Sequence, residues 1–248
     1  MKTALITGAT SGIGRATARI LARNNYKIII CGRRQERLNE LQSELSAFTK
    51  VHTLLFDVRD KAAVFSAIAG LPLAFITIDI LINNAGNAHG MDPIQNGDPD
   101  DWDAMIDSNL KGLLYVSKAV IPQMTARKSG HIINIGSTAA KEVYPNGNVY
   151  CASKHAVDAI SQGMRIDLNP FGIRVGAIHP GMVETEFSEV RFKGDTTRAA
   201  NVYKGFEALQ AEDIADIIHF VVSRPYHVNI ADLIVMSTAQ ASSTIVRR

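Results

Sequence analysis

The stretch "TGATSGIG", residues 7–14, decides the fold prediction because it joins a strand pattern to a helix pattern. Residues 3–7, "TALIT", have the composition of a buried strand, and apolar side chains recur at helical spacing after the glycines. Gly8, Gly12 and Gly14 allow a tight turn and let a pyrophosphate approach the backbone N–H groups at the start of the helix. The spacing is G-x-x-x-G-x-G rather than the common G-x-G-x-x-G, so the motif by itself is also compatible with a plain turn before a helix.

Short apolar runs alternate with helix-period segments along the rest of the chain. Strands are expected at residues 3–7, 27–31, 51–57, 78–84, 131–137, 174–180 and 233–236. This alternation predicts an α/β fold in which crossover helices cover a parallel sheet. From Gly181 to about Gly205 the alternation lapses into charged and glycine-containing sequence, which indicates a substrate loop over a site, at about residues 182–205.

Two of the expected helices have distinctive signals. Residues 35–48 place four apolar side chains on one face: Leu38, Leu41, Leu45 and Phe48. Further on, Asp98 occupies an N-cap position, and Pro99 follows in the first turn of a helix that ends before Gly130. We therefore expect Phe48 to share the helical face of the leucines and a long helix to begin directly after Asp98.

Length and composition favour one large globular domain over residues 1–248. Apolar residues make up 46% of the chain, although a length of 248 residues would also allow two domains. The longest apolar stretch, residues 71–82, contains Asp79 and is too short to span a bilayer, so no membrane partner is expected. The first residues lack the basic start, apolar core and cleavage site of a signal peptide, which favours a cytoplasmic protein.

Charge and cysteine content argue against other classes of protein. The formal net charge is +2 and no basic stripe is present, so nucleic acid is not expected as a partner. Cys31 and Cys151 form neither a disulfide framework nor a metal-ligand spacing, and both are interpreted as reduced structural thiols. No metal site is predicted.

The residues after the second strand indicate which cofactor the glycine motif would bind. An acidic side chain at this place, about 20 residues beyond the glycines, usually selects NAD. Here Gly32 is followed by Arg33 and Arg34, whose guanidinium groups offer forked donors to the 2′-phosphate of NADP. A solvated pair of charges at the start of a helix is the alternative. Asp57, at the end of the third strand, either accepts a bond from the adenine amino group or caps the segment that follows.

Further motifs follow in a fixed order: "NNAG" at 83–86, Asn109, Ser137, Tyr150 with Lys154, and "PG" at 180–181. Together with the glycine motif they resemble the short-chain dehydrogenase/reductase family over nearly the whole chain. The resemblance implies a single Rossmann-type, doubly wound domain with a seven-stranded parallel sheet, a nicotinamide cofactor, and a catalytic tetrad made of Asn109, Ser137, Tyr150 and Lys154. It also implies cofactor contacts from Gly8, Gly12, Ile13, Gly14, Asn84, Lys154, Pro180, Gly181 and Thr185, the last of which helps to hold the carboxamide.

Alcohol oxidation gives Tyr150 and Lys154 separate roles. A base must take the hydroxyl proton while the nicotinamide accepts the hydride, and a free tyrosine, with a pKa of about 10, is a poor base. An ammonium about 4 Å away, at an effective dielectric of about 20, interacts by about 4 kcal/mol, enough to bring that pKa to about 7. Residues four apart on a helix share one face, so Lys154 is placed to do this. Ser137 would donate to the carbonyl oxygen, and the resemblance assigns Asn109 to a water chain that reaches Lys154.

Four segments resemble one subgroup of the family, the NADP-dependent 3-hydroxy acid dehydrogenases: "GRRQERL" (32–38), "GHIINIGSTA" (130–139), "SEVRFKGD" (188–195) and "HVNIADLIVM" (227–236). This subgroup implies hydride transfer between NADP and a 3-hydroxy acid or hydroxy amino acid, of the serine, allo-threonine or 3-hydroxypropionate type. Ser237 departs from the proline of the subgroup, a difference that concerns C-terminal contacts and not the chemistry. The alternatives are a general carbonyl or 3-oxoacyl reductase of the same family, and a non-catalytic cofactor-sensing protein, against which the intact tetrad argues.

A 3-hydroxy acid needs a cation beyond Tyr150 to bind its carboxylate. The predicted loop offers Arg191, whose planar fork grips a carboxylate through two bonds, and Lys193, a point charge. The alternative is that both side chains only solvate the loop. The resemblance also implies a homotetramer in which helices around residues 100–125 and 150–168 pair across subunits.

Overall fold

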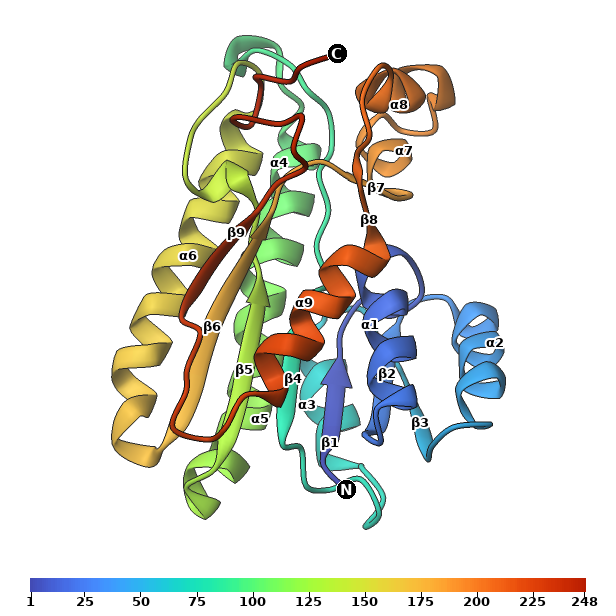
Figure 1. Cartoon of the computed structure of the whole chain (residues 1–248), viewed down its shortest axis with the longest axis vertical. Helices are drawn as coiled ribbons and strands as arrows, with labels where there is room; N and C mark the ends of the chain where they lie inside the picture. The colour runs from blue at the N-terminus through green and yellow to red at the C-terminus, as the bar shows by residue number, and fades with distance from the viewer.

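The computed structural model describes all 248 residues and contains a central seven-stranded parallel sheet (Figure 1). Its strands are β1 (Thr3–Ile6), β2 (Lys27–Gly32), β3 (Val51–Leu55), β4 (Ile80–Asn83), β5 (Gly130–Ile135), β6 (Ile173–Pro180) and β9 (Asp232–Val235). Their spatial order is β3-β2-β1-β4-β5-β6-β9, so the chain builds outward from β1 in one direction and from β4 in the other. The predicted α/β fold with a doubly wound, seven-stranded parallel sheet is confirmed.

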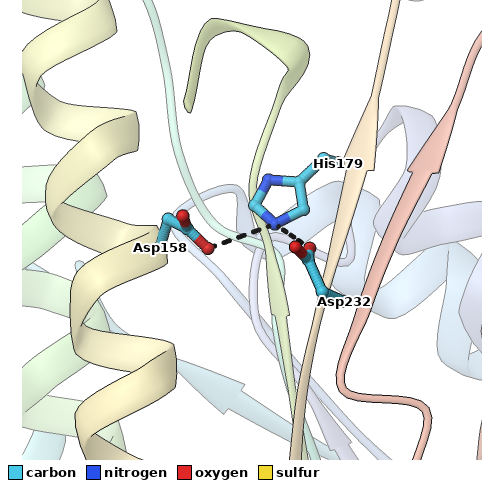
Figure 2. Close-up of side chains that lie close together, drawn as sticks. All are labelled: Asp158, His179 and Asp232. Carbon is cyan, nitrogen blue, oxygen red and sulfur yellow. Dashed lines mark ion pairs between the residues drawn. The ribbon is translucent and has the colours of Figure 1, made fainter. Parts of the chain in front are cut away.

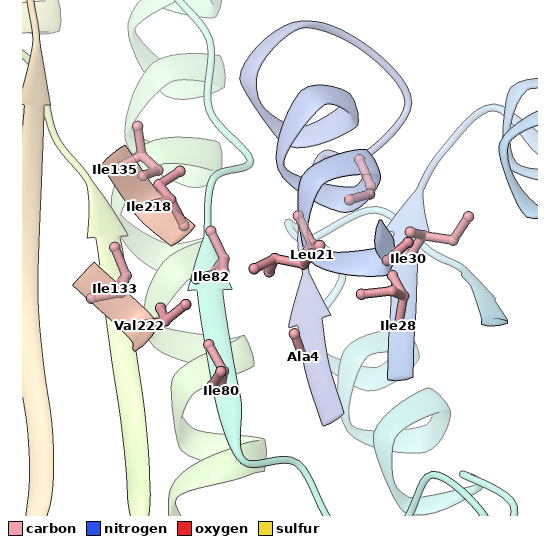
Figure 3. Packing of buried hydrophobic residues seen from close by; sticks show 14 of the residues in the cluster. Ala4, Leu21, Ile28, Ile30, Ile80, Ile82, Ile133, Ile135, Ile218 and Val222 are labelled. Carbon is pink, nitrogen blue, oxygen red and sulfur yellow. The ribbon is translucent and has the colours of Figure 1, made fainter. Parts of the chain in front are cut away.

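Helices cover both faces of this sheet. On one face lie α1 (Gly12–Arg23), α2 (Gln35–Leu45) and α9 (Ala211–Ser223), and on the other lie α3 (Lys61–Ala69), α5 (Leu113–Arg127) and α6 (Asn148–Leu168). Successive side chains of a strand point to opposite faces. Ile28 and Ile30 of β2 therefore join the core on the first face (Figure 3), whereas Ile29 and Cys31 join the core on the second.

The long helical segment after Asp98 begins where the sequence predicts. Asp98 accepts a hydrogen bond from the Asp100 N–H (3.0 Å), and α4 (Pro99–Ile106) has its proline in the first turn. A π-helical segment, Asp107–Gly112, then joins α4 to α5, which ends before Gly130. Such π-helical segments are frequent at functional sites, and this one contains Asn109. Short 3-10 turns occur at Ile94–Asn96, Thr138–Ala140 and Asn169–Phe171.

The prediction that Phe48 shares the helical face of the leucines is wrong. Leu38, Leu41 and Leu45 are buried as expected, but α2 ends at Leu45, and Phe48 is 51% exposed. Beyond the helix end, helical spacing no longer sets the direction of a side chain. The Phe48 ring lies instead beneath the Arg23 guanidinium, whose central carbon is 5.3 Å from the ring centroid.

The segment 183–210 is not the irregular loop that the sequence suggests. β7 (Val183–Glu184) pairs with β8 (Leu209–Gln210), and α7 (Phe187–Arg191) and α8 (Thr196–Tyr203) lie between them, beyond the carboxyl ends of the central strands (Figure 1). Asp195 accepts a hydrogen bond from the Arg198 N–H (2.9 Å) and so caps α8. Part of the polar and glycine-containing sequence therefore consists of caps and turns between short helices, including Gly194 with φ +92°.

None of the helices combines the length and apolar composition that a membrane span requires.

Candidate active site

A cavity of about 550 Å³ opens at the carboxyl ends of the strands. Parallel strands place the loops that follow them at one edge of the sheet, so residues far apart in the sequence meet there. Most of the predicted site residues line this cavity: Gly8, Gly12, Ile13, Arg33, Arg34, Asp57, Asn84, Ser137, Tyr150, Lys154, Pro180, Gly181, Thr185 and Arg191. Gly14, Asn109 and Lys193 lie outside its lining.

The glycine loop closes tightly over the start of α1. Gly8 and Gly12 have φ angles of +64° and +47°, which residues with side chains rarely adopt. A Cβ on Gly12 would lie 3.2 Å from Thr185 Cγ2, so the loop and the segment 183–210 approach each other across the cavity. Gly14 lies outside the cavity lining, and a Cβ there would collide with the Gly8 carbonyl and the Asn84 amide. Its missing side chain lets the loop close against Asn84.

Arg33 and Arg34 line the cavity in different surroundings. Arg34 donates to Thr10 Oγ1 (2.9 Å) and to Ser11 Oγ (3.0 Å), which fixes its guanidinium beside the glycine loop. The Arg33 side chain is 62% exposed, and its Nη1 lies 3.4 Å from Asp57 Oδ2. Arg33 is therefore the freer of the two to bind an anion.

Asp57 caps the segment after β3. Its Oδ1 accepts a hydrogen bond from the Arg59 backbone N–H (3.0 Å), and its Oδ2 lies 2.7 Å from Arg59 Nη2. Burial raises the pKa of this carboxyl, but the bonds from Arg59 and the nearby Arg33 outweigh burial and hold the pKa below its usual value. These contacts fit the capping interpretation of Asp57, and the same carboxylate also faces the cavity.

The ends of β5 and α6 bring three predicted catalytic side chains together. Ser137 follows β5 and caps the turn Thr138–Ala140, whose backbone donates to its Oγ (3.1 Å). Tyr150 and Lys154 lie near the start of α6, and they are only 8% and 7% exposed. Lys154 Nζ donates to the Ile135 carbonyl at the end of β5 (3.0 Å), so the lysine is tied to the strand that leads to the serine.

Burial has the largest effect on the pKa values of Tyr150 and Lys154. It raises the pKa of Tyr150, an effect that the nearby Tyr144 reinforces and that Ser137 and Arg191 oppose. Burial also lowers the pKa of Lys154 to about 8. Tyr150 is therefore a protonated phenol at neutral pH. Burial therefore outweighs the lowering of the Tyr150 pKa by neighbouring groups.

Asn109 lies behind the cavity, on the π-helical segment. Its Oδ1 accepts from the Asn87 N–H (2.8 Å), and its Nδ2 donates to the Asn87 carbonyl (2.9 Å) and to Ser153 Oγ (3.0 Å). A Cβ on Gly86 would lie 2.9 Å from Asn109 Oδ1 and 3.6 Å from Lys154 Nζ, so both groups lie close to the side-chain position of Gly86. The Asn109 amide is thus bonded to protein groups and braces the chain next to Lys154.

Arg191, the last residue of α7, lies beside Tyr150. Its guanidinium carbon is 5.4 Å from the centroid of the Tyr150 ring, and its Nη2 donates to the Tyr144 hydroxyl (3.1 Å). Its Nε makes a longer contact with the Gly90 carbonyl (3.4 Å). Because these partners are neutral, they do not offset the charge that Arg191 presents to the cavity.

Lys193 is held away from the cavity. Its Nζ lies 2.9 Å from Asp101 Oδ2 and 3.6 Å from Asp98 Oδ2. The two carboxylates attract the ammonium toward α4, on the outer side of the site. Of the two predicted substrate cations, the structure brings only Arg191 to the cavity.

Sequence reasoning missed three residues around the cavity. Glu186 lies 2.7 Å from Arg37 Nη1 and 3.1 Å from Arg34 Nη1, which ties the segment 183–210 to the start of α2. Tyr144 bonds Arg191, and Gln240 accepts from the backbone of the segment that follows β6 (2.9 Å). The separation of 149 residues between Arg37 and Glu186 leaves no short spacing that could reveal such a pair.

The fold and the site together define a class of protein. A glycine loop at the start of a helix in a doubly wound sheet, with a phenol, a hydroxyl and an ammonium in one cavity, is the arrangement of a Rossmann-type oxidoreductase with a dinucleotide cofactor. The chain belongs to the short-chain dehydrogenase family, whose model matches residues 2–196. The family predicted from the motifs is therefore confirmed.

Individual relatives cover almost the whole chain. It is 46% identical over 238 residues to the NADP-dependent 3-hydroxy acid dehydrogenase YdfG of Escherichia coli strain K12, with 96% of this chain and 95% of the other covered. It is 47% identical over 240 residues to sulfoacetaldehyde reductase 2 of Chromohalobacter salexigens, with the same coverage. A solved structure, the closed form of a serine dehydrogenase complexed with NADP+, is 45% identical, with a TM-score of 0.94 and 99% of each chain covered. The resemblance to the 3-hydroxy acid dehydrogenase subgroup is confirmed.

Proposed function

We propose that the chain is an NADP-dependent oxidoreductase that transfers hydride between the nicotinamide and a 3-hydroxy acid or hydroxy amino acid, with residues 1–248 acting as one dinucleotide-binding and catalytic domain. The observation that carries this proposal is the Arg191 guanidinium, which has neutral partners and lies 5.4 Å from the Tyr150 ring. An acid group bound by Arg191 leaves the neighbouring carbinol or carbonyl close to Tyr150. The relatives are named for a 3-hydroxy acid, serine and sulfoacetaldehyde, all of which carry an acid group near the reacting carbon.

In the proposed reaction, Tyr150 exchanges a proton with the substrate oxygen. During reduction its phenol donates to the carbonyl oxygen, and the Ser137 hydroxyl donates a hydrogen bond to the same oxygen. Oxidation is the reverse and requires the phenolate, which the Lys154 ammonium stabilises. Asn109 lies behind the cavity, and its hydrogen bonds to Asn87 and Ser153 hold the chain next to Lys154 in place.

The residues of the cavity fit NADP. Gly8 and Gly12 leave the start of α1 open to a pyrophosphate, and Arg33 and Arg34 offer donors to a 2′-phosphate. The remaining proposed contacts come from Ile13, Asp57, Asn84, Lys154, Pro180, Gly181 and Thr185. When bound, the oxidised nicotinamide accepts the hydride and adds a positive charge that favours the Tyr150 phenolate.

The proposal is tested by NADP+ reduction with a panel of substrates. The panel contains 3-hydroxypropionate, serine, allo-threonine, 2-hydroxyethanesulfonate and uncharged alcohols of similar size. We expect kcat/KM to be highest for the acids. Comparable values for neutral alcohols, or a higher kcat/KM for a 3-oxoacyl compound assayed separately by NADPH oxidation, would favour the general reductase. Cofactor binding without turnover of any compound would favour the cofactor-sensing alternative.

Arg33→Ala is expected to weaken the binding of NADP+ by about 10- to 100-fold and that of NAD+ by less than about twofold. The reason is that a charge-assisted bond to a phosphate contributes about 1.5–3 kcal/mol, and NAD+ lacks that phosphate. Fluorescence titration with NADPH and NADH measures both affinities. Arg37→Ala is the matched control, because Arg37 is a nearby guanidinium outside the cavity lining, although its partner Glu186 lines the cavity. Equal losses for the two cofactors in Arg33→Ala would show that Arg33 does not bind the phosphate.

Arg191→Gln is expected to lower kcat/KM for acid substrates by about 30-fold, which corresponds to about 2 kcal/mol, and to leave neutral alcohols nearly unaffected. The physical reason is the loss of a charged donor pair for the acid group. Lys193→Gln is the control and should change neither value, since Asp101 and Asp98 hold this lysine. If acids and neutral alcohols lose the same factor in Arg191→Gln, the residue serves the shape of the cavity and not acid recognition.

We also propose that the protein is a cytoplasmic homotetramer in which the helices around residues 100–125 and 150–168 pair across subunits. Ile166 on α6 is 72% exposed, and a large apolar side chain of this kind gains from a partner surface. Sedimentation at micromolar concentration measures the assembly, and a monomer would contradict the proposal.

A further inference from the structure

Four polar side chains form a cluster behind Ser137, outside the lining of the cavity. Figure 2 shows three of them: Asp158, His179 and Asp232. His179 near the end of β6 has a fully buried side chain, Asp158 comes from α6, and Asp232 begins β9. Lys141 follows the short turn after Ser137 and completes the cluster. Its Nζ lies 3.1 Å from Asp158 Oδ2 and 2.8 Å from Asp232 Oδ2.

His179 contacts the Ser137 turn from behind. Its Nδ1 lies 3.3 Å from the Ser137 carbonyl oxygen, and its ring occupies the space that a side chain on Gly136 would need. On the opposite side of the ring, Nε2 lies 2.8 Å from Asp232 Oδ1 and 3.6 Å from Asp158 Oδ1, although neither contact is a regular hydrogen bond. The ring is thus held between a backbone turn and two carboxylates.

The cluster already contains a cation, the Lys141 ammonium. Asp158, His179 and Asp232 bring three possible metal ligands within 4.8 Å of one another. The Lys141 ammonium already contacts both carboxylates and offsets their charge. The arrangement is therefore that of an ion-pair network in which His179 is buried and Lys141 and Asp232 reach the surface.

This network joins Ser137 to the helix that carries the other proposed catalytic groups. On α6, Asp158 lies one turn beyond Lys154 and two turns beyond Tyr150, so the three side chains share one face of the helix. His179 connects that face to the Ser137 turn. A shift of His179 would therefore change the position of Ser137 relative to α6.

We propose that His179 is a positioning residue: held by Asp158 and Asp232, it fixes the main chain at Ser137 and thereby the relative placement of the Ser137 and Tyr150 hydroxyls. The inference rests on the proposed function, since it assumes that Ser137 bonds the substrate oxygen. Small displacements of a catalytic donor lower the rate strongly. Because His179 lies outside the cavity lining, its effect falls on kcat and not on cofactor affinity.

The first test compares His179→Ala with His131→Ala. His131 is also a buried histidine, 2% exposed, but it lies near the amino end of β5, away from the cavity. Both variants are expected to unfold at lower temperatures than the wild type. Below those temperatures, only His179→Ala is expected to lower kcat, by about tenfold or more, with the KM for NADP+ within about threefold of the wild-type value.

Asp232→Asn extends this test to the network. It is expected to lower kcat by a smaller factor, about two- to fivefold, because it weakens the hold on the His179 ring without removing the ring. In the His179→Ala background it should add no further loss, since both substitutions act through one contact. Independent, multiplicative losses would overturn the proposed route through His179.

A second readout does not depend on turnover. The Ala139 N–H donates to Ser137 Oγ (3.1 Å), and the Ala140 N–H donates to the Ser137 carbonyl (2.9 Å). Hydrogen–deuterium exchange of these two amides is expected to be at least about tenfold faster in His179→Ala than in His131→Ala, because the turn loses its support.

Ser137→Ala separates the two possible failures. Suppose that Ser137→Ala has lost turnover. A wild-type kcat in His179→Ala then overturns the positioning role and leaves the proposed function standing. Equal amide exchange in His179→Ala and His131→Ala has the same consequence. Wild-type turnover in Ser137→Ala overturns the role of Ser137, and the inference about His179 with it.

Discussion

Tyr150→Phe is expected to lower kcat by about 10²- to 10⁴-fold, while the Kd for NADP+ stays within about twofold of the wild-type value. The phenolic hydroxyl is the proposed proton-transfer group, and general acid–base catalysis contributes a factor of this size. The ring itself is retained, and its contact with Phe187, 5.8 Å between centroids, keeps the shape of the cavity. Steady-state kinetics and a fluorescence titration of the cofactor provide the two numbers.

Tyr144→Phe is the matched control for this prediction. Tyr144 lines the same cavity and bonds Arg191, but it is not placed in the proton-transfer step. Its hydroxyl supports the proposed acid-binding side chain, so a modest rise in KM is expected with most of kcat retained. Substantial turnover in Tyr150→Phe would remove that residue from the mechanism, whatever the result for Tyr144.

Lys154→Met is expected to abolish most turnover and yet to make the folded protein more stable at pH 7. Burial lowers the pKa of this lysine from 10.5 to about 8, so the folded state holds a charge that it disfavours by about 3 kcal/mol. The substitution also removes the hydrogen bond to the Ile135 carbonyl, which contributes about 1 kcal/mol. The expected net gain in unfolding free energy is therefore about 2 kcal/mol, measurable by urea denaturation.

The pH dependence of this gain has a definite sign. Below about pH 8 both the folded and the unfolded wild type carry the Lys154 proton, and the full cost of burying the charge is present. Between about 8 and 10.5 the folded state has lost the proton while the unfolded state retains it, so wild-type stability rises with pH. The advantage of Lys154→Met should therefore shrink across this window. Lys118→Met, at an exposed position on α5, should change stability by less than about 0.5 kcal/mol. A destabilised Lys154→Met at pH 7 would show that the buried charge is well compensated.

Local patterns in the sequence predict the sheet and most of its helices. The apolar runs of the seven strands and the Asp98–Pro99 signal depend on neighbouring residues, so they are visible without the fold. The same reasoning fails at Phe48, because it assumes that the helix continues, and the chain turns after Leu45. It also fails for the segment 183–210, where polar residues cap short helices whose stability depends on the surface beneath them.

The sequence likewise predicts some features of the candidate site and not others. Motif residues such as Tyr150 and Lys154 are visible because the helical period places them on one face, and both line the cavity. Their protonation is not visible, because desolvation depends on how many other segments cover them. The His179 network is equally hidden, since its members come from α6, β6, β9 and the turn after β5.

By itself the sequence determined the family, the doubly wound α/β fold and a set of site residues most of which line the cavity, because motifs and apolar periods are properties of short stretches. Only the tertiary structure decided which of two nearby cations reaches the site. Arg191 and Lys193 lie two residues apart and carry the same charge, but Asp101 and Asp98 hold the lysine outside, while the arginine meets only neutral partners beside Tyr150. The physical reason is that a charge pairs with whatever the fold brings close to it, and those partners come from distant parts of the chain.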